Sequence, residues 1–395
     1  MFKNIAKIFT SHIVVKTIGL ANIAFVLFFL SVKDFGEYSY LFLLLNLVAV
    51  IIDPLLSAYL VDSITLNYKK YNFGILIISL ILTPFFYFFI NFFYNKLSVT
   101  LFILFSATYF ISAILKSYLN SKERYYNYGI VDVVRQLSVF CTTVFFFYFL
   151  NSNSYIELLE FNYLVSFIGM IVIAIIFLKK EEIEFIINFS RLKKQTFQSK
   201  FLIFYTALIP FISFIDSYFV DAYLTKDDLG IYSFSLKVYN ISLMLVVPIF
   251  TVLNIKQIEI AKEGNYMLFV KKSFKKVIFF SSMIFLVTLL FNWLITNYIY
   301  LEYKSSFWNT NILLFGSFIT YITLPFSFLI AYRKYRYLFA LGIIAVLFNI
   351  LINYFFIEKY GMLVASFSTF LCQIIINLGA AIISFFLFRN SKNEN

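Results

Sequence analysis

The chain contains twelve apolar runs of about 20 residues, and this pattern limits the fold more than any other feature. A run of this length can cross a bilayer as an α-helix. A transmembrane β-barrel would instead need segments of about 10 residues with alternating polar positions. Only 13% of the residues are charged, against about 25% in soluble domains. The sequence therefore predicts an all-α polytopic membrane protein. The runs are Ile13–Ser31, Tyr40–Val61, Phe73–Tyr94, Ser98–Leu119, Gly129–Leu150, Phe161–Leu178, Phe201–Val220, Ser233–Ile255, Val277–Tyr298, Asn311–Tyr332, Tyr337–Ile357 and Met362–Phe388.

One segment of the chain occurs twice, 194 residues apart and without a gap. The first copy reads KDFGEYSY before an apolar run, and the second reads KDDLGIYSF before another. The matched pairs are Asp34 and Asp228, Gly36 and Gly230, Tyr38 and Tyr232, Ser39 and Ser233, Asn46 and Asn240, and Pro54 and Pro248. Each half has six runs, an even number, so both copies enter the membrane in the same direction. The repeat predicts two parallel six-helix bundles, an arrangement found in transporters.

The two halves define the expected domains. Residues 1–178 form an N-terminal six-helix bundle, 179–200 a cytoplasmic amphipathic linker, and 201–395 a C-terminal six-helix bundle. The linker has apolar positions that suit a helix lying on the membrane surface. They are Ile183, Phe185, Ile186, Phe189 and Leu192.

Basic residues fall on alternate connections between the runs. Of the 32 lysines and arginines, 23 lie on one face, five on the other and four inside the runs. By the positive-inside rule, the first face and both termini are cytoplasmic. No small-residue cleavage site follows the first run, so we expect that run to be a transmembrane helix rather than a signal peptide. The expected location is the bacterial inner membrane, and the net charge of +12 sets topology rather than binding nucleic acid.

The repeated element, an acidic residue followed by Gly and Tyr-Ser before an apolar helix, resembles that of the polysaccharide flippases in the multidrug/oligosaccharidyl-lipid/polysaccharide superfamily. The chain is most similar to the Wzx-type O-antigen flippases, over essentially its whole length, including the segment IDSYFVDAYLTKDDLGIYSF. The resemblance implies a MATE-like, V-shaped pair of bundles around a central cavity that helices 1, 2, 7 and 8 line. It also implies transport of an undecaprenyl-pyrophosphate-linked oligosaccharide, of the O-antigen or capsule type, from the cytoplasmic to the periplasmic leaflet.

Four basic residues fall inside the runs, where a charge is costly and usually functional. A lipid diphosphate is an anion, and lysine and arginine are its natural partners. We expect Lys16 to receive the pyrophosphate from the cytoplasmic side and Lys237 to hold it later; the alternative is that both reach out to lipid head groups. Arg135 is a further substrate-binding candidate, or the internal partner of Asp132 three residues away. Lys116 is expected to reach the membrane surface.

Asn46 and Asn240 match across the repeat and are candidates to contact sugar hydroxyls. The alternative is that they hydrogen bond between helices, the commoner use of Asn in a membrane bundle. Gly36 and Gly230 are expected in turns before their helices.

Asp53 and Asp216 are candidates for ion coupling, through H⁺ or Na⁺, or for counter-ions of the basic groups. Asp53 directly precedes Pro54, and Pro248 lies at the equivalent point of the second half. A proline frees backbone carbonyl groups and kinks a helix, so the two prolines are candidate hinges.

No nucleotide-binding loop and no metal-ligand spacing are present, so neither ATP, a metal nor another cofactor is expected. Two other functions fit the pattern. Export of drugs or cations by the same fold would favour acidic rather than basic interior residues. A membrane O-antigen polymerase or glycosyltransferase would need a large external loop, which the spacing of the runs excludes, so we expect a transporter rather than an enzyme. Its partners would be the lipid-linked substrate, the membrane and the machinery that polymerises the polysaccharide.

Overall fold

The computed structural model describes residues 2–64, 70–72, 74–121, 124–150, 154–179, 184–186, 189–263 and 266–389, apart from some side chains within these ranges. Nearly all of these residues are helical, because a backbone surrounded by lipid must satisfy its own hydrogen bonds. The chain divides into two compact units, Met1–Ile203 and Phe204–Asn395, which we describe separately.

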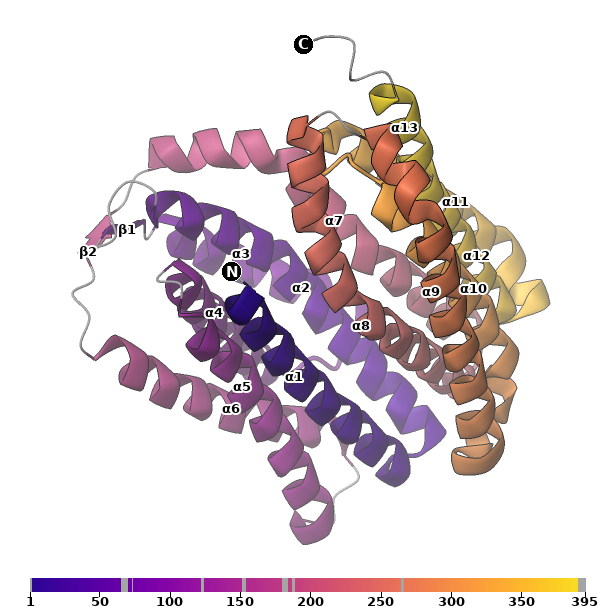
Figure 1. The fold of residues 1–395 in the computed structure, drawn as a ribbon. Helices are drawn as coiled ribbons and strands as arrows, with labels where there is room; N and C mark the ends of the chain where they lie inside the picture. Colours follow the sequence, from indigo (N-terminus) through magenta and orange to yellow (C-terminus); the bar gives the residue numbers. More distant parts are fainter. Residues whose placement is uncertain are drawn as a thin grey trace. The chain divides into compact units, whose positions relative to one another are not determined.

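Unit 1 contains six long helices, several of which lie side by side in Figure 1. Helix α1 packs against α5, and α4 packs against α2, α5 and α6. A π-helical turn, Phe146–Leu150, extends α5. The helices are α1 (Phe2–Phe29), α2 (Val32–Ile64), α3 (Gly74–Phe93), α4 (Val99–Ser121), α5 (Tyr125–Phe145) and α6 (Tyr155–Leu178).

Unit 2 follows the same plan, with its last helix interrupted by a π-helical turn. Helix α7 begins just before the boundary between the units, and α10 packs against α8, α9 and α12. The helices are α7 (Phe189–Tyr223), α8 (Lys226–Glu263), α9 (Tyr266–Leu294), α10 (Phe307–Thr323), α11 (Tyr335–Tyr360), α12 (Leu363–Gln373) and α13 (Gly379–Phe388). The π-helical turn Ile374–Leu378 joins α12 to α13, so the two form one long helical segment.

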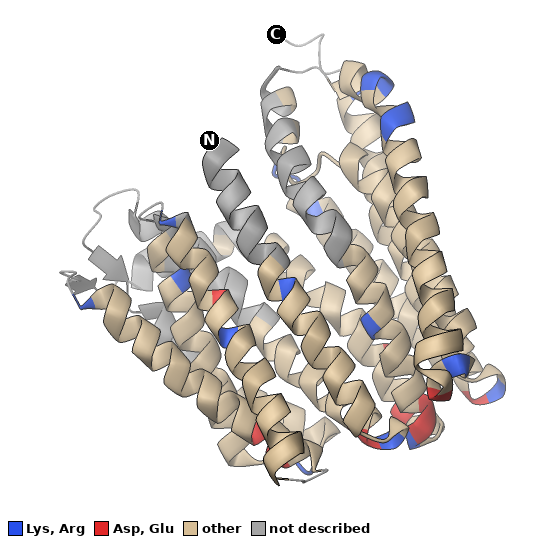
Figure 2. Cartoon of the chain, turned by 60° about the horizontal axis from the view of Figure 1, so that its bottom comes forward, with Lys and Arg blue, Asp and Glu red and all other residues tan. Residues whose placement is uncertain are grey.

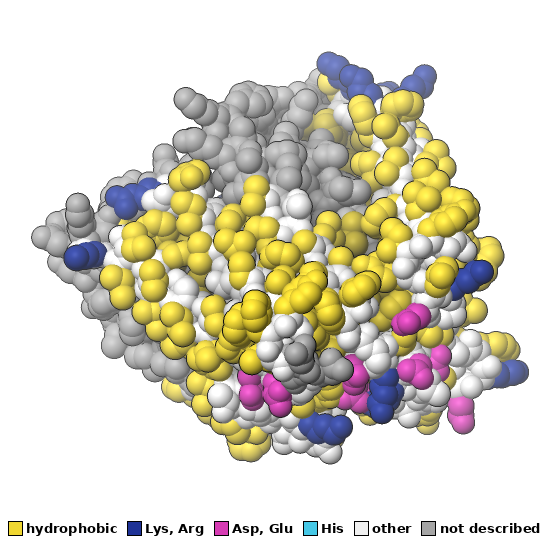
Figure 3. All heavy atoms as spheres, turned by 90° about the horizontal axis from the view of Figure 1, so that it is seen from below, with side chains coloured by type: hydrophobic (Ala, Val, Ile, Leu, Met, Phe, Trp, Pro, Cys, Tyr) yellow, Lys and Arg dark blue, Asp and Glu magenta, His cyan; other side chains and the backbone are white. Residues whose placement is uncertain are grey.

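The prediction of an all-α polytopic membrane protein is confirmed. Seven helical segments in the described part are long and apolar enough to cross a membrane, and large apolar side chains such as Phe28 and Phe92 are exposed. In Figure 3 hydrophobic side chains cover much of the visible surface, the acidic ones gather toward the lower edge, and the basic ones lie at several places around the outline. Two short strands are the exception: β1 (Lys70–Asn72) pairs in parallel with β2 (Glu184–Ile186).

The segment 179–200 differs from the surface helix expected there. Residues Glu184–Ile186 form β2, whose backbone hydrogen bonds go to β1, and helix resumes only at Phe189 as the start of α7.

The repeated acidic residues begin helices. The backbone nitrogen of Asp34 donates to the hydroxyl of Ser31 over 3.1 Å, and that hydroxyl donates to the Asp34 carboxylate over 2.6 Å. Thr225 and Asp228 make the same reciprocal pair over 3.1 and 2.7 Å. Such capping boxes satisfy amide groups at a helix start. Helix α2 therefore begins at Val32 and α8 at Lys226.

The expectation that the repeated glycines form turns is wrong. Gly36 and Gly230 lie inside helices and are buried, because the capping boxes start both helices earlier. The only glycine with a positive φ in the described part is Gly361, which ends α11 with φ 68°.

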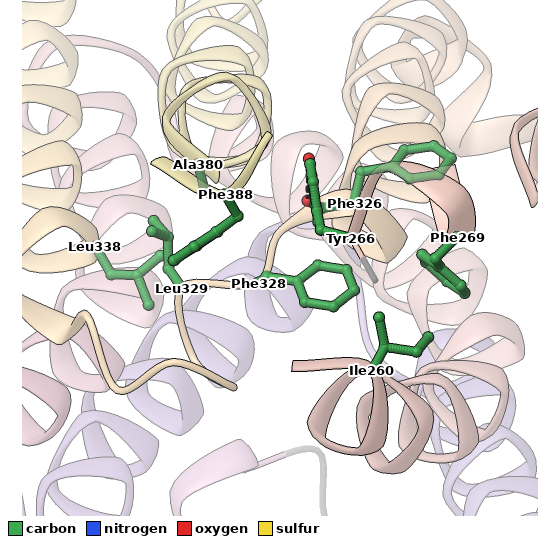
Figure 4. Packing of buried hydrophobic residues seen from close by; sticks show 9 residues of the cluster. All are labelled: Ile260, Tyr266, Phe269, Phe326, Phe328, Leu329, Leu338, Ala380 and Phe388. Carbon is green, nitrogen blue, oxygen red and sulfur yellow. Dashed lines mark hydrogen bonds between the residues drawn. The ribbon is translucent and has the colours of Figure 1, made fainter. Parts of the chain in front are cut away.

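The connection between α10 and α11 fills one end of unit 2 with apolar side chains. Phe328 and Leu329 in this connection are fully buried, and Tyr266 and Phe269 at the start of α9 lie around them (Figure 4). The side-chain nitrogen of Gln257, near the end of α8, donates to the carbonyl of Pro325 over 2.7 Å. This connection therefore holds the ends of several helices together.

Candidate functional site

Asp216 on α7 has a buried carboxylate within unit 2. Its side chain is completely buried, and five side chains from three other helices donate hydrogen bonds to it. Within the described part of the chain no basic side chain forms an ion pair with Asp216. An ionisable group inside a membrane bundle is a functional-site candidate, because burying it is costly.

The five donors surround both carboxylate oxygens. Oδ1 accepts from Asn349 over 2.8 Å, from Asn353 over 2.7 Å and from Ser368 over 2.9 Å. Oδ2 accepts from the hydroxyl of Tyr232 over 3.0 Å and from that of Thr369. These neutral donors stabilise a negative charge without a counter-ion.

Two oxygen atoms beside the carboxylate have no hydrogen-bond partner. They are Oδ1 of Asn349 and Oδ1 of Asn353, both completely buried. Buried polar atoms are normally hydrogen bonded, so two orphan oxygens next to a carboxylate mark a place that can take a further ligand. The two residues are four apart on α11 and so lie on one face of that helix.

Unit 1 has an amide where unit 2 has this carboxylate. Asn22 on α1 lies 194 residues before Asp216, the same offset as the sequence repeat, and it is also buried. Asn22 hydrogen bonds with Tyr38, which is the repeat partner of Tyr232. The tyrosine contact is therefore present in both units, but only unit 2 has a negative charge at this point.

The charged groups of unit 1 gather elsewhere, part-way along α1, α4 and α5. Lys116 lies 2.9 Å from one oxygen of Asp132, and Arg135 lies 3.5 Å from the other. Lys16 is close enough to this carboxylate and both cations to interact with them electrostatically. Figure 2 shows charged residues part-way along helices of this unit as well as at helix ends. We call Lys16, Lys116, Asp132 and Arg135 the cationic cluster: three positive side chains meet one carboxylate.

Aromatic residues and Asn46 extend this cluster. The guanidinium group of Arg135 lies 4.9 Å from the ring centre of Tyr109, and the hydroxyl of Tyr109 donates to Asn46 over 3.0 Å. The amide nitrogen of Asn46 donates to the carbonyl of Phe42 over 2.7 Å. Asn46 therefore bonds between α2 and α4, while Arg135 is held by both Asp132 and an aromatic ring.

Helix α8 carries Lys237 and Asn240 on one side. Its other side carries a polar stripe that consists of Tyr232, Ser235, Tyr239 and Ser242. Asn240 is exposed, and Lys237 is half-buried. At about 100° per residue, Lys237 lies about 200° around the helix from Tyr239, which belongs to the buried stripe. The two substrate candidates of this helix thus lie away from the interior of unit 2.

Three other candidates have side chains outside the described part. These are Asp53, Pro54 and Pro248, and the structure tests neither the coupling role of Asp53 nor the hinge roles of the two prolines.

No protein-family model matches the chain, and no curated protein matches it. Solved structures do. An inward-facing multidrug resistance MATE family transporter of the MOP superfamily aligns with a TM-score of 0.73 and 11% identity, over 97% of this chain and 99% of that chain. The lipid II flippase MurJ, in an inward closed conformation, aligns with a TM-score of 0.67 and 17% identity, over 99% of this chain and 88% of that chain.

This chain has the MATE transporter fold. A MOP superfamily transporter from Pyrococcus furiosus, described as having a binding pocket of reverse polarity, also aligns, with a TM-score of 0.65 and 12% identity over 99% of this chain and 96% of that one. Identities this low establish the MATE fold alone, so the function must be argued from the side chains.

The sequence singles out Asp216 as a candidate but not the residues that hydrogen bond to it in this MATE fold. Tyr232 was part of the repeat, and Asn349 and Asn353 are polar residues four apart inside an apolar run, a visible signal of a buried polar site. Ser368 and Thr369 gave no such signal, because Ser and Thr are common in membrane helices, where they bond between helices.

Proposed function

We propose that this chain is a flippase for an undecaprenyl-pyrophosphate-linked oligosaccharide of the O-antigen or capsule type. It moves this lipid from the cytoplasmic to the outer leaflet of the bacterial inner membrane by alternating access, with both termini in the cytoplasm. The oligosaccharide is not modified, so the chain acts as a transporter and not as an enzyme.

The observation that carries the proposal is the cationic cluster of unit 1. Lys16, Lys116 and Arg135 gather around one carboxylate, that of Asp132. Several cationic side chains gathered within a membrane bundle are uncommon and suit the binding of an anion. A diphosphate supplies two charges and several acceptor oxygens. The polyprenyl tail of the same molecule can remain in the lipid.

Two residues of the repeat-bearing helix α8 are the proposed substrate contacts within unit 2. Lys237 supplies a further cation and Asn240, which is exposed, supplies an amide for sugar hydroxyls. Lys16 is exposed, so it is available to a ligand as well as to Asp132. Asn46 is already hydrogen bonded inside unit 1, so its part is to hold Tyr109 beneath Arg135.

Export of polymer by cells tests this assignment. In a strain lacking the gene for this chain, Lys16→Ala and Lys237→Ala should each lower polymer export about tenfold when supplied in place of the wild type, because each removes a charged contact to phosphate. Lys304→Ala is the matched control: this lysine is exposed in the turn Leu301–Ser306, outside the helices that carry the candidate site. Export that is unchanged in both test variants would remove the phosphate contact from the proposal.

Asp216 is the proposed coupling residue, binding H⁺ or Na⁺. The amide nitrogens of Asn349 and Asn353 now point at the carboxylate, and half a turn of each amide would present an oxygen in their place. Together with the carboxylate and the hydroxyls of Ser368 and Thr369, this would provide an all-oxygen set, which suits hard cations. Protonation of Asp216 is the alternative, because burial away from water disfavours a charged carboxylate.

A drug or cation exporter is the second candidate, and Asp216 is the observation that favours it. A buried carboxylate suits a cationic substrate, and two of the similar structures are multidrug resistance transporters by name. The two candidates separate in one experiment. Cells that express an exporter become less susceptible to cationic drugs, and this protection depends on Asp216; cells that express the proposed flippase gain polymer export and no protection.

A further inference from the structure

The buried face of α8 is a polar stripe that ties this helix to its neighbours. Tyr232, Ser235, Tyr239 and Ser242 are spaced three, four and three residues apart, which puts them on one helical face. Tyr232 donates to Asp216 on α7, and Ser242 bonds to Ser317 on α10 over 3.1 Å. The stripe therefore links α8 to α7 at Tyr232 and to α10 at Ser242, about three helical turns later.

Gln373 on α12 is the partner of Tyr239. Its side-chain nitrogen donates to the hydroxyl of Tyr239 over 2.8 Å, and it is 8% exposed. Thr369, one helical turn earlier on α12, donates to the carboxylate of Asp216. The same short helix thus contacts the carboxylate at one turn and α8 at the next.

A glycine on α10 fixes where the amide of Gln373 lies. A Cβ atom added to Gly316 would come within 2.4 Å of the Gln373 side-chain oxygen, so any larger residue displaces this amide. The side-chain oxygen of Gln373 also accepts a hydrogen bond from the hydroxyl of Thr320 on α10 over 3.5 Å. Gln373 is thus placed between α10 and α8 by close packing on one side and a hydrogen bond on the other.

The helix changes its winding directly after Gln373. The π-helical turn Ile374–Leu378 follows it, and Asn377 within that turn donates to Thr320 over 2.9 Å. Single π-helical turns inside α-helices are rare and occur frequently at functional sites. Gln373 therefore lies directly before the change of helical winding between α12 and α13.

We propose that Gln373 is a positioning residue that transmits the occupancy of the Asp216 carboxylate to α8, and thereby sets the position of Lys237 and Asn240. The proposal rests on the proposed function, because it gives the coupling site and the substrate residues a physical link. A ligand that takes oxygens from Asp216 changes the partners of Ser368 and Thr369. The resulting shift of α12 reaches Tyr239 through the hydrogen bond from Gln373, which is a second link to α8 beside the direct bond from Tyr232 to Asp216. A coupling of this kind requires one element whose position both sites influence, and α8 is that element.

Cysteine labelling at position 240 tests the link without any transport measurement. Asn240→Cys is introduced together with Cys141→Ser, since Cys141 is exposed and Cys372 is buried. The labelling rate of the purified protein is measured while NaCl replaces choline chloride at constant ionic strength. It is measured separately while the pH falls from about 8 to about 5, with each rate divided by that of a free model thiol at the same pH, because the thiolate is the reactive form. In the parent protein at least one of these ligands should change the rate about fivefold or more, as a coupling between two sites does. Asp216→Asn should abolish the response.

The Gln373 variants are the decisive comparison. Gln373→Leu and Tyr239→Phe should each reduce the response to less than about twofold. The double variant should add nothing further, because both remove the same hydrogen bond. Gly316→Ala should behave like Gln373→Leu. Its matched control is Gly19→Ala, where the new Cβ would lie 3.8 Å from the side-chain oxygen of Gln136, an ordinary contact, and the response should match the parent.

A purely structural role for Gln373 gives a different result. The variants would then melt at lower temperature but keep the full ligand response at position 240. That result, or a parent protein whose labelling responds to neither Na⁺ nor pH, would overturn the coupling. The proposed function fails separately, when vesicles that contain the wild-type chain do not translocate lipid-linked oligosaccharide.

Discussion

Positions 22 and 216 occupy equivalent places in the two units and carry different chemistry. Each is a buried polar residue that hydrogen bonds to the repeated tyrosine, Tyr38 in unit 1 and Tyr232 in unit 2. In unit 2 the residue is a carboxylate with five donors; in unit 1 it is an amide whose Oδ1 has no hydrogen-bond partner. The comparison teaches that the two halves kept a common packing arrangement while their charges diverged.

Because their charges differ, the two units have different proposed binding sites. Unit 1 collects three cations around Asp132, an arrangement that suits an anionic head group. Unit 2 holds Asp216 among neutral donors, an arrangement that suits a proton or a small cation. The cationic cluster proposed for the pyrophosphate and the carboxylate proposed for the coupling ion thus belong to different units, while Lys237 and Asn240 are proposed substrate contacts in unit 2.

The largest expected effect separates the two equivalent residues directly. Asp216→Ala leaves five buried donors without their acceptor and should lower the free energy of unfolding by about 3 kcal/mol. Asn22→Ala removes one hydrogen bond and should cost about 1 kcal/mol. Thermal melting of both purified variants measures the difference. Equal losses would mean that the network around Asp216 adds nothing to the common packing.

The effect of a bound cation on stability is a second test of the difference between Asp216 and Asn22. At ten times its dissociation constant, a cation bound at Asp216 should raise the free energy of unfolding by about 1.4 kcal/mol. Asp216→Asn should remove this gain, and Asn22→Ala should keep most of it. The measurement is a melting curve with and without Na⁺, repeated at two pH values. A gain that persists in Asp216→Asn would place the cation elsewhere.

Within the cationic cluster, stability and binding should separate. Lys116→Ala removes the closer cation from the buried carboxylate of Asp132 and should lower the free energy of unfolding by about 2 kcal/mol. Lys16→Ala changes an exposed residue, so melting should change by no more than about 0.5 kcal/mol. Its effect should appear in the affinity for a lipid diphosphate. If Lys16→Ala melts like Lys116→Ala and binds normally, the lysine is part of the packing and not of the site.

The last prediction concerns the helix starts that the two units share. Ser31→Ala and Thr225→Ala each remove a capping-box hydroxyl and should each cost about 1 kcal/mol. Melting of the two variants checks whether the costs agree. A clear difference between them would show that the repeated helix starts have diverged as the buried positions have.

Much of the fold could be predicted, because lipid makes hydrophobic run length a direct measure of a spanning helix. Helix ends were less accessible. The runs begin at Tyr40 and Ser233, whereas α2 and α8 begin at Val32 and Lys226, since a capping box can start a helix among polar residues that a hydropathy pattern leaves out. Strand β2 depends on a partner about 110 residues earlier in the chain, and no local pattern reveals such a pairing.

The candidate site was only partly predictable for a related reason. A charged residue in an apolar run is visible one residue at a time, so Lys16, Arg135 and Asp216 could be named. Their partners depend on which helices pack together. Asp216 binds residues on α8, α11 and α12, up to 153 positions away, and a single sequence does not indicate that contact. Asn22 could not be singled out from the sequence, because an amide in an apolar run becomes informative only when Asp216 is known to be its equivalent.

The most direct measurement of the central claim is leaflet-resolved detection of a lipid-linked oligosaccharide in vesicles. The substrate starts in one leaflet of vesicles with and without the purified chain, and a sugar-specific enzyme or lectin added outside reports what has crossed. We expect rapid crossing only in vesicles that contain the chain, and slower crossing with Lys16→Ala or Lys237→Ala. Crossing at the same rate in protein-free vesicles and in those with the wild-type chain would contradict the account.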